Sequence, residues 1–232
     1  VLDAYTCTEC GRCTDNCPAW GTEKSLSPRD IVIKIRHFAS ENAGKEEMKT
    51  DYLVDEGWVT AEELYACTTC SACVEVCPLL IDQMGKILDM RRYLTMEGKL
   101  TGAAVRTLQK LQSHGNPWGF ESTDRAPWAK EEEVPILGNG AGNDAQDFDV
   151  IFWTGCFGAY DPRGQEVASA IVQLLKKAGV SFAIMGPNET CTGDPARRLG
   201  EEALYQELAT TNVESMKAFN VKKVIANCPH CF

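Results

Sequence analysis

The chain has 232 residues, 44% of them hydrophobic and 24% charged, a balance that excludes a disordered tail and a collagen-like repeat. Its net charge of −10 argues against a nucleic-acid partner, and no apolar run reaches the roughly 18 residues that span a membrane. We expect no signal peptide, and a location in the cytoplasm or on the cytoplasmic face of a membrane.

Cysteine is the unusual residue, and its twelve copies are clustered. Eight lie within residues 1–77, none within 78–155 and four within 156–231. Short spacings of this kind indicate metal binding rather than disulfides, in keeping with a reduced compartment. The cysteine motifs reach almost to both ends of the chain, and we therefore expect a fragment of a longer subunit.

The first cysteine group is an internal repeat. Residues 5–18 align with residues 65–78, and both copies read C-x2-C-x2-C-x3-C-P with a tyrosine two positions before the first cysteine. This is the run of two-cluster bacterial ferredoxins, in which the fourth cysteine of each run binds the other cluster. We therefore predict two [4Fe–4S] clusters, the first held by Cys7, Cys10, Cys13 and Cys77 and the second by Cys67, Cys70, Cys73 and Cys17. Structural zinc is the alternative, although zinc prefers cysteines in two pairs.

Helices are predicted around these runs. Ser27 and Pro28 begin one over residues 29–39, Thr60 and Glu63 form the capping box of a short one, and apolar spacing predicts another over 79–96. Clusters between helices resemble the α-helical ferredoxin domain in the iron–sulfur subunits of succinate dehydrogenase and related respiratory enzymes. We take residues 1–98 as this domain.

Residues 99–148 are predicted to be one helix and a linker. Valine and leucine recur at helical spacing over 101–113, and the turn-forming stretch 114–117 ends that helix. We interpret residues 115–148 as a linker over the surface. Its acidic run, residues 131–133, is either a solvated face or a docking patch for a partner.

From residue 149 the pattern alternates. We predict strands at 150–154, 180–185 and 223–226, and helices at 166–178 and from 194 to about 219. This alternation predicts a small parallel sheet in an α/β domain over 149–232, and the α+β class for the whole chain. Cys156, Cys191 and Cys228 each follow a predicted strand, so we expect them together at the carboxyl edge of the sheet.

Two phrases in this domain carry a specific resemblance: Thr190-Cys191-Thr192-Gly193-Asp194-Pro195-Ala196-Arg197-Arg198 and Asn227-Cys228-Pro229-His230-Cys231-Phe232. They resemble the Cys-Cys-Gly domain of heterodisulfide reductase and its relatives. Those relatives include the iron–sulfur subunits of glycolate oxidase and anaerobic glycerol-3-phosphate dehydrogenase, and electron-transfer-flavoprotein:quinone oxidoreductases. A helical ferredoxin domain followed by a Cys-Cys-Gly domain is the order of the fused D-type subunit, so the resemblance covers most of the chain.

The resemblance implies a third iron–sulfur centre, with one departure. The family motif has two adjacent cysteines, and here Thr192 replaces the second. Four cysteines remain, which suffice for a cubane but are one fewer than the family's noncubane [4Fe–4S] cluster uses: Cys156, Cys191, Cys228 and Cys231. The type of this centre stays open, and zinc or a site that has lost its metal are the alternatives.

Four residues near this centre are expected to tune it. Asp194 begins a helix whose N-terminal amides and dipole would face an anionic cluster, and Arg197 and Arg198 lie in its first turn. The arginines either compensate the charge of the cluster or form surface salt bridges. His230 is predicted to donate a hydrogen bond near the cluster rather than to ligate it, because four thiolates already fill the site.

We find no nucleotide-binding glycine loop, nucleophile elbow or flavin motif in the sequence and predict no catalytic residue. The resemblance implies the iron–sulfur electron-transfer subunit of a membrane-associated oxidoreductase, with no membrane span of its own. Its partners would be a flavoprotein or dehydrogenase and a membrane subunit that reacts with quinone, or a disulfide acceptor. A catalytic heterodisulfide (thiol–disulfide) reductase subunit is the alternative, and a structural metal module is the third hypothesis.

Overall fold

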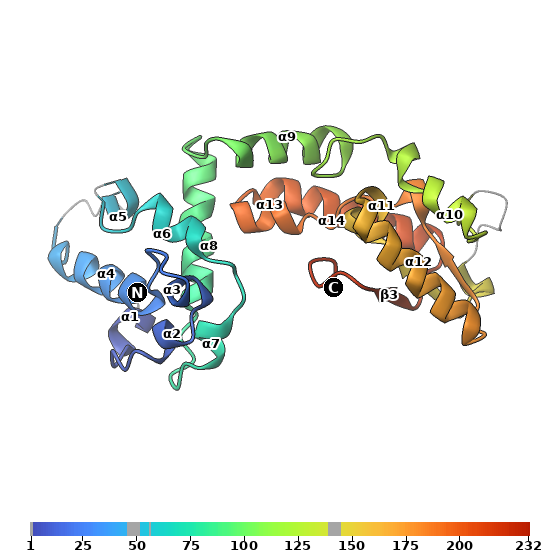
Figure 1. The fold of residues 1–232 in the computed structure, drawn as a ribbon. Helices are drawn as coiled ribbons and strands as arrows, with labels where there is room; N and C mark the ends of the chain where they lie inside the picture. The colour runs from blue at the N-terminus through green and yellow to red at the C-terminus, as the bar shows by residue number, and fades with distance from the viewer. Residues whose placement is uncertain (1, 46–51, 56, 139–144) are drawn as a thin grey trace. The chain divides into compact units, whose positions relative to one another are not determined.

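The computed structural model describes residues 2–45, 52–55, 57–138 and 145–232 (Figure 1). The chain divides into two compact units. The first comprises Val1–Leu100 with Arg198–Gly200, and the second comprises Thr101–Arg197 with Glu201–Phe232. No helix among the described residues is long and apolar enough to cross a membrane.

The first unit is built from helices. In chain order they are α1 (Leu2–Thr6), α2 (Arg12–Asp15), α3 (Pro18–Gly21), α4 (Pro28–Glu41), α5 (Tyr52–Asp55), α6 (Ala61–Ala66), α7 (Ala72–Glu75) and α8 (Gln83–Met96). Helices α4 and α6 pack against α8 around a core that includes Ile31, Leu64 and Ile87, all fully buried. The two short helices inside the cysteine runs, α2 and α7, pack against each other.

The sequence repeat returns as a repeat of backbone conformation. Glu9 and Gly11 in the first run have left-handed φ angles of 59° and 84°, and their equivalents Thr69 and Ser71 have 55° and 63°. Such angles are uncommon for residues other than glycine. Their recurrence at matching positions therefore shows that the two runs fold as equivalent loops.

Helix starts in this unit follow their capping side chains. The predicted cap Ser27 accepts a hydrogen bond from the amide of Asp30 at 3.3 Å, which confirms the start of α4. The predicted capping box is confirmed at α6, where Thr60 and Glu63 exchange hydrogen bonds of 2.8 and 3.1 Å. The helix predicted from residue 79 begins only at Gln83, because the side chain of the preceding residue caps α8 there.

The second unit contains a parallel sheet of three strands in the order β2-β1-β3. Its elements are α9 (Ala103–His114), η1 (Ser122–Arg125), α10 (Pro127–Glu131), η2 (Ala145–Asp147), β1 (Val150–Trp153), α11 (Gly155–Tyr160), α12 (Pro162–Lys177), β2 (Phe182–Ile184), η3 (Gly186–Asn188), α13 (Asp194–Leu199), α14 (Glu202–Ala218) and β3 (Val224–Ala226). In the central strand, Ile151 pairs with Ala183 of β2 and with Val224 of β3. The predicted parallel sheet and the α+β class are confirmed.

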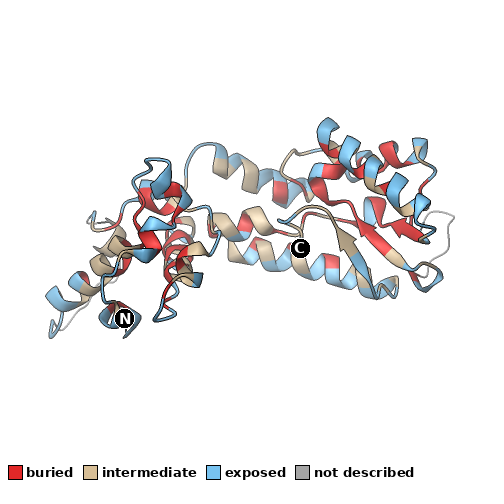
Figure 2. Cartoon of the chain, turned by 60° about the horizontal axis from the view of Figure 1, so that its bottom comes forward, coloured by how far each residue is buried: buried red, intermediate tan, exposed pale blue. Residues whose placement is uncertain are grey.

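Helices cover both faces of this sheet. Phe152 is buried on one face with Val172 of α12, and Trp153 is buried on the other face, where Met216 of α14 packs. Figure 2 shows β1 and β2 as buried and β3, at the edge of the sheet, as only partly buried. Because all three strands run in the same direction, their carboxyl ends lie together along one side of the sheet, which we call its carboxyl edge.

The stretch predicted to be a surface linker is partly core, so that prediction is wrong. Residues 122–125 form η1 and residues 127–131 form α10, and Ala126, Trp128 and Leu137 are buried. Isolated apolar residues between turn signals show no period, which is why the sequence pattern did not reveal their burial.

The helix predicted from Asp194 to about Phe219 is in fact two helices, α13 and α14. Gly200 between them has a φ of 95°, which interrupts any continuous α-helix, and Glu201 is the N-cap of α14. A short helix that was not predicted, α11, follows β1 directly, at Gly155 with a φ of 69°.

Helix α12 begins at Pro162, before the predicted residue 166, because Asp161 caps it. The Asp161 carboxylate accepts hydrogen bonds from the amides of Arg163 and Gly164 at 3.0 and 3.1 Å. Asp161→Ala should therefore lower the free energy of unfolding by about 1 kcal/mol, measured by denaturant titration. Glu166→Ala removes an exposed carboxylate from the same helix and should change it by less than about 0.5 kcal/mol. Equal losses in both variants would contradict the capping role.

Candidate metal centres

Four cysteines of the first unit line one hollow: Cys7, Cys10, Cys13 and Cys77. Three of them belong to the first cysteine run, and Cys77 ends the second run. The set is the one predicted for the first cluster. Two cationic side chains, Arg12 and Arg29, also line this hollow.

A second hollow repeats the arrangement with the roles of the runs exchanged. Its cysteines are Cys67, Cys70, Cys73 and Cys17. Cys17 closely follows α2 and Cys77 closely follows α7, and these two helices pack against each other. Their packing carries the last cysteine of each run to the hollow of the other run.

The thiols in these hollows differ in exposure. Cys10 and Cys70 are exposed at the equivalent position of each run. Burial raises the pKa of Cys13, and burial together with the neighbouring thiolates raises the pKa of Cys73 to about 12. A free thiol with such a pKa stays protonated at neutral pH, so any metal group bound here must displace protons.

A backbone amide and a buried arginine hold the second run in place. The Thr69 amide donates to Cys67 Sγ at 3.3 Å. Arg91, which is 3% exposed, donates to the carbonyl oxygens of Leu64 and Cys67, the latter at 2.6 Å, and its guanidinium carbon lies 5.1 Å from the centre of the Tyr65 ring. Arg91 was not singled out from the sequence, where it is one polar position in an amphipathic helix.

The second unit brings together the four cysteines predicted for the third centre. Cys156 lies in the first turn of α11 after β1, Cys191 follows η3, and Cys228 and Cys231 follow β3. A hydrogen bond between the thiols lowers the pKa of Cys156 and raises that of Cys191. Burial, with the charge of Cys228, raises the pKa of Cys231 to about 12. The thiols therefore influence one another at the carboxyl edge of the sheet.

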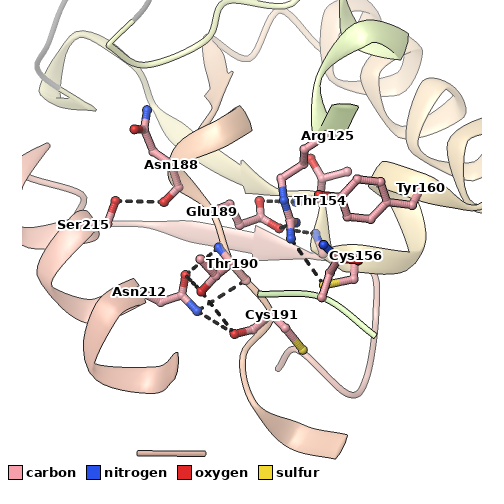
Figure 3. A network of polar contacts seen from close by, with 12 residues as sticks. Arg125, Thr154, Cys156, Tyr160, Asn188, Glu189, Thr190, Cys191, Asn212 and Ser215 are labelled. Carbon is pink, nitrogen blue, oxygen red and sulfur yellow. Dashed lines mark hydrogen bonds and ion pairs between the residues drawn. The ribbon is translucent and has the colours of Figure 1, made fainter. Parts of the chain in front are cut away.

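Helix α14 fixes the loop that carries Cys191 (Figure 3). Asn212 is 4% exposed, and its amide group accepts from the Thr190 amide at 2.9 Å and donates to the Cys191 carbonyl at 3.0 Å. The Cys191 amide donates in turn to the carbonyl of Gly115 at 2.7 Å. This loop is thus held from two sides by hydrogen bonds to its backbone.

A buried ion pair lies beside Cys156, and the sequence interpretation missed it. Arg125 and Glu189 are 2% and 1% exposed, and their side chains are 2.7 Å apart. Burial alone would lower the pKa of Arg125, but the charge of Glu189 raises it above its ordinary value. Glu189 stands between the second strand and Cys191, so the rule that sites gather at strand ends could have revealed it. Arg125 ends η1, in a stretch whose sequence shows no periodic pattern and therefore carries no such signal.

The four residues predicted to tune the third centre make three separate sets of contacts. His230 Nδ1 lies 3.0 Å from Asp194 Oδ2, and the His230 side chain is 60% exposed. The guanidinium of Arg197 lies 5.1 Å from the centre of the Tyr205 ring. Arg198 belongs to the segment grouped with the first unit, and there it hydrogen bonds to the loop of the second cysteine run.

Each of the three sites offers four thiols as donors. In the part of the chain that the structure describes, no three His, Cys, Asp or Glu side chains are placed to share a single metal ion. A cubane [4Fe–4S] cluster is held by four cysteine thiolates, and each hollow of the first unit supplies such a set. The residues therefore fit iron–sulfur clusters.

Comparisons with known proteins agree with this donor chemistry. The 4Fe-4S dicluster domain family matches residues 1–78, and the cysteine-rich domain family matches residues 150–232. A probable iron–sulfur-binding oxidoreductase of Bacillus subtilis, FadF, is 37% identical over the whole chain. An EtfAB:quinone oxidoreductase of Syntrophomonas wolfei is 38% identical over 99% of the chain. One subunit of the dihydromethanophenazine:CoB–CoM heterodisulfide reductase of Methanosarcina mazei is 30% identical over the whole chain.

These relatives are longer than the chain. It covers 38% of the Bacillus protein, 36% of the Syntrophomonas protein and 56% of the Methanosarcina protein. No solved structure matches the chain.

Gly155 lets two elements of the third site approach each other. A Cβ atom at this position would lie 2.9 Å from Cys231 Sγ, and the φ of Gly155 is 69°. Gly155→Ala should therefore displace Cys231 and lower the iron and sulfide content per chain. Gly179→Ala is the matched control, because Gly179 has a φ of 66° and no atom within 4 Å of its Cβ position. Both variants carry a backbone strain of about 1 kcal/mol, but only Gly155→Ala should lose iron; equal iron content would refute this role of Gly155.

Proposed function

Because the chain belongs to the iron–sulfur oxidoreductases that join a 4Fe-4S dicluster domain to a cysteine-rich domain, a family that includes a heterodisulfide reductase component, we propose that it relays single electrons through three centres. The observation that carries the proposal is the exchange of Cys17 and Cys77 between the two hollows. Each centre takes ligands from both loops, so the two centres must be close neighbours. Short distances between centres favour electron transfer.

In the first unit, the residues of the chain hold and shield the two clusters. We assign Cys7, Cys10, Cys13 and Cys77 to one [4Fe–4S] cluster and Cys67, Cys70, Cys73 and Cys17 to the other. The clusters supply one-electron transfer when bound. Burial of Cys13 and Cys73 excludes water from the inner side of each hollow, and the exposed Cys10 and Cys70 mark the sides open to a redox partner.

In the second unit, the four cysteines at the sheet edge would hold the third centre. Thr192, which stands where the Cys-Cys-Gly motif has its second cysteine, donates its hydroxyl to the His230 carbonyl at 3.4 Å. A hydroxyl stays protonated at neutral pH and does not replace a bridging thiolate. This argues for a four-thiolate cluster and for electron transfer, and against heterodisulfide reduction at this site.

The relatives suggest the proteins at either end of the relay. One relative is named an EtfAB:quinone oxidoreductase, another is named a subunit of a heterodisulfide reductase, and a third is named a probable membrane-anchored ferredoxin. We therefore propose a flavoprotein or dehydrogenase donor, a quinone-reactive or disulfide acceptor, and a location in the cytoplasm or at the cytoplasmic face of a membrane. Residues 1–98 would form the dicluster domain and 149–232 the cysteine-rich domain.

The exchange of cysteines between the runs has a direct test. Cys77→Ala should disturb the same centre as Cys10→Ala, although Cys77 belongs to the second run. Cys70→Ala should disturb the other centre. Redox titrations followed by EPR, with iron analysis of each variant, distinguish the two outcomes. If Cys77→Ala matched Cys70→Ala instead, each run would hold its own cluster and the assignment would be wrong.

Removal of Cys191 tests the third centre. The intact protein should carry about twelve iron atoms, and Cys191→Ala should remove about four of them while the two coupled cubane signals remain. Iron and sulfide analysis with low-temperature EPR measures both effects. Zinc in place of iron would overturn the redox function, and loss of all three centres would contradict the division into two independent units.

A further inference from the structure

Arg125 is a buried cation that the proposed relay has not yet used. It is the last residue of η1, in the stretch of the second unit between α9 and β1. Its side chain points toward Cys156 of the third site (Figure 3). Nη1 lies 2.7 Å from Glu189 Oε1, and Nη2 donates to Cys156 Sγ at 3.4 Å. The guanidinium therefore joins a buried carboxylate to the sulfur of a proposed cluster ligand.

Other groups fix the direction of this contact. The guanidinium carbon lies 5.1 Å from the centre of the Tyr160 ring, which places an aromatic face beside the cation. Glu189 is held by the amides of Gly155 and Thr154, which donate to its carboxylate at 2.8 and 3.3 Å. Because these amides belong to the turn that leads into Cys156, the ion pair and the ligand are parts of one rigid assembly.

Stability alone does not explain this arrangement. A buried ion pair loses so much hydration that well-packed apolar residues often stabilise a fold at least as well. Arg125 also leaves Nε buried with no hydrogen-bond partner in the part of the chain that the structure describes, which adds a further cost. A cation kept at this cost and directed at a ligand sulfur calls for a functional reason.

The reason is the charge that a cluster gains on reduction. Reduction adds one electron, taken from a donor protein or a chemical reductant, and neither forms nor breaks a covalent bond. A positive charge in a buried site of low dielectric favours the more negative form, and hydrogen bonds to cluster sulfurs act in the same direction. The Glu189 carboxylate opposes the cation, so the two residues should act with opposite signs.

We propose that Arg125 raises the reduction potential of the third centre through its contact with Cys156 Sγ, and that Glu189 positions the guanidinium and offsets part of its charge. This inference rests on the proposed function, since it requires a cluster at Cys156 and its three partner cysteines. Arg125 acts on the cluster only through the ligand sulfur, so it is not a catalytic residue.

The test is the midpoint potential of the third centre, measured by dithionite titration followed by EPR on the whole chain. Arg125→Gln should lower this potential and Glu189→Gln should raise it, while the two cubanes of the first unit keep theirs. Arg163→Gln is the matched control, because it removes an exposed arginine from the same unit and should shift nothing. Arg125→Lys keeps the positive charge but loses the planar guanidinium that contacts Glu189 and Cys156 together. It should lower the potential by less than Arg125→Gln does.

The outcomes separate this inference from the proposed function. Absence of a third centre from the unaltered protein would overturn both. A third centre whose potential stays the same in Arg125→Gln and Glu189→Gln, or moves in the same direction in both, would overturn only the role of Arg125. If Arg125→Gln fails to hold the centre, the sign of the shift in Glu189→Gln decides, and an unchanged or lowered potential would refute the inference.

Discussion

The first unit depends on one constraint, which is that loops 60 positions apart must each complete the hollow of the other. Cys17 and Cys77 meet it only if α2 and α7 stay packed together. The helical core around Ile31 and Leu64 supports this packing, because α4 of that core contacts α2 and α8 contacts α7. Left-handed residues such as Thr69 then turn each loop so that its three closely spaced cysteines line one hollow. Helix packing, loop conformation and donor position are therefore consequences of one requirement.

The second unit reaches a four-thiol site by other means. Parallel strands end along one edge of a sheet, so segments that are distant in sequence deliver Cys156, Cys191 and Cys228 to the same place without any repeat. Two contacts complete the convergence. Gly155 leaves room for Cys231 Sγ, and Asn212 ties the Cys191 loop to α14. Here the topology of the sheet brings the cysteines together, and local contacts set their spacing.

The sequence predicted what periodic spacing and capping chemistry encode. The repeated cysteine runs, the cap at Ser27 and the three strands all depend on residues near one another in the chain, and the structure confirms the cap and the strands. The failures depend on tertiary contacts. Burial of Trp128 needs the sheet and α12 as partners, which no local pattern reveals. The break at Gly200 did carry a signal, a glycine within a long helical pattern, but helices also tolerate an isolated glycine, and only the φ of 95° decides.

The two buried arginines show why residue type alone could not predict a role. Arg91 and Arg125 each have an aromatic ring 5.1 Å from the guanidinium carbon, and each contacts a cysteine. Arg91 donates to the carbonyl of Cys67, a contact that fixes the backbone of a loop. Arg125 donates to the sulfur of Cys156, an atom that would share the electrons of a bound cluster. The atom that the arginine contacts, a carbonyl oxygen or a ligand sulfur, thus separates a residue that holds a loop from one that sets a potential, and that difference arises only in the folded chain.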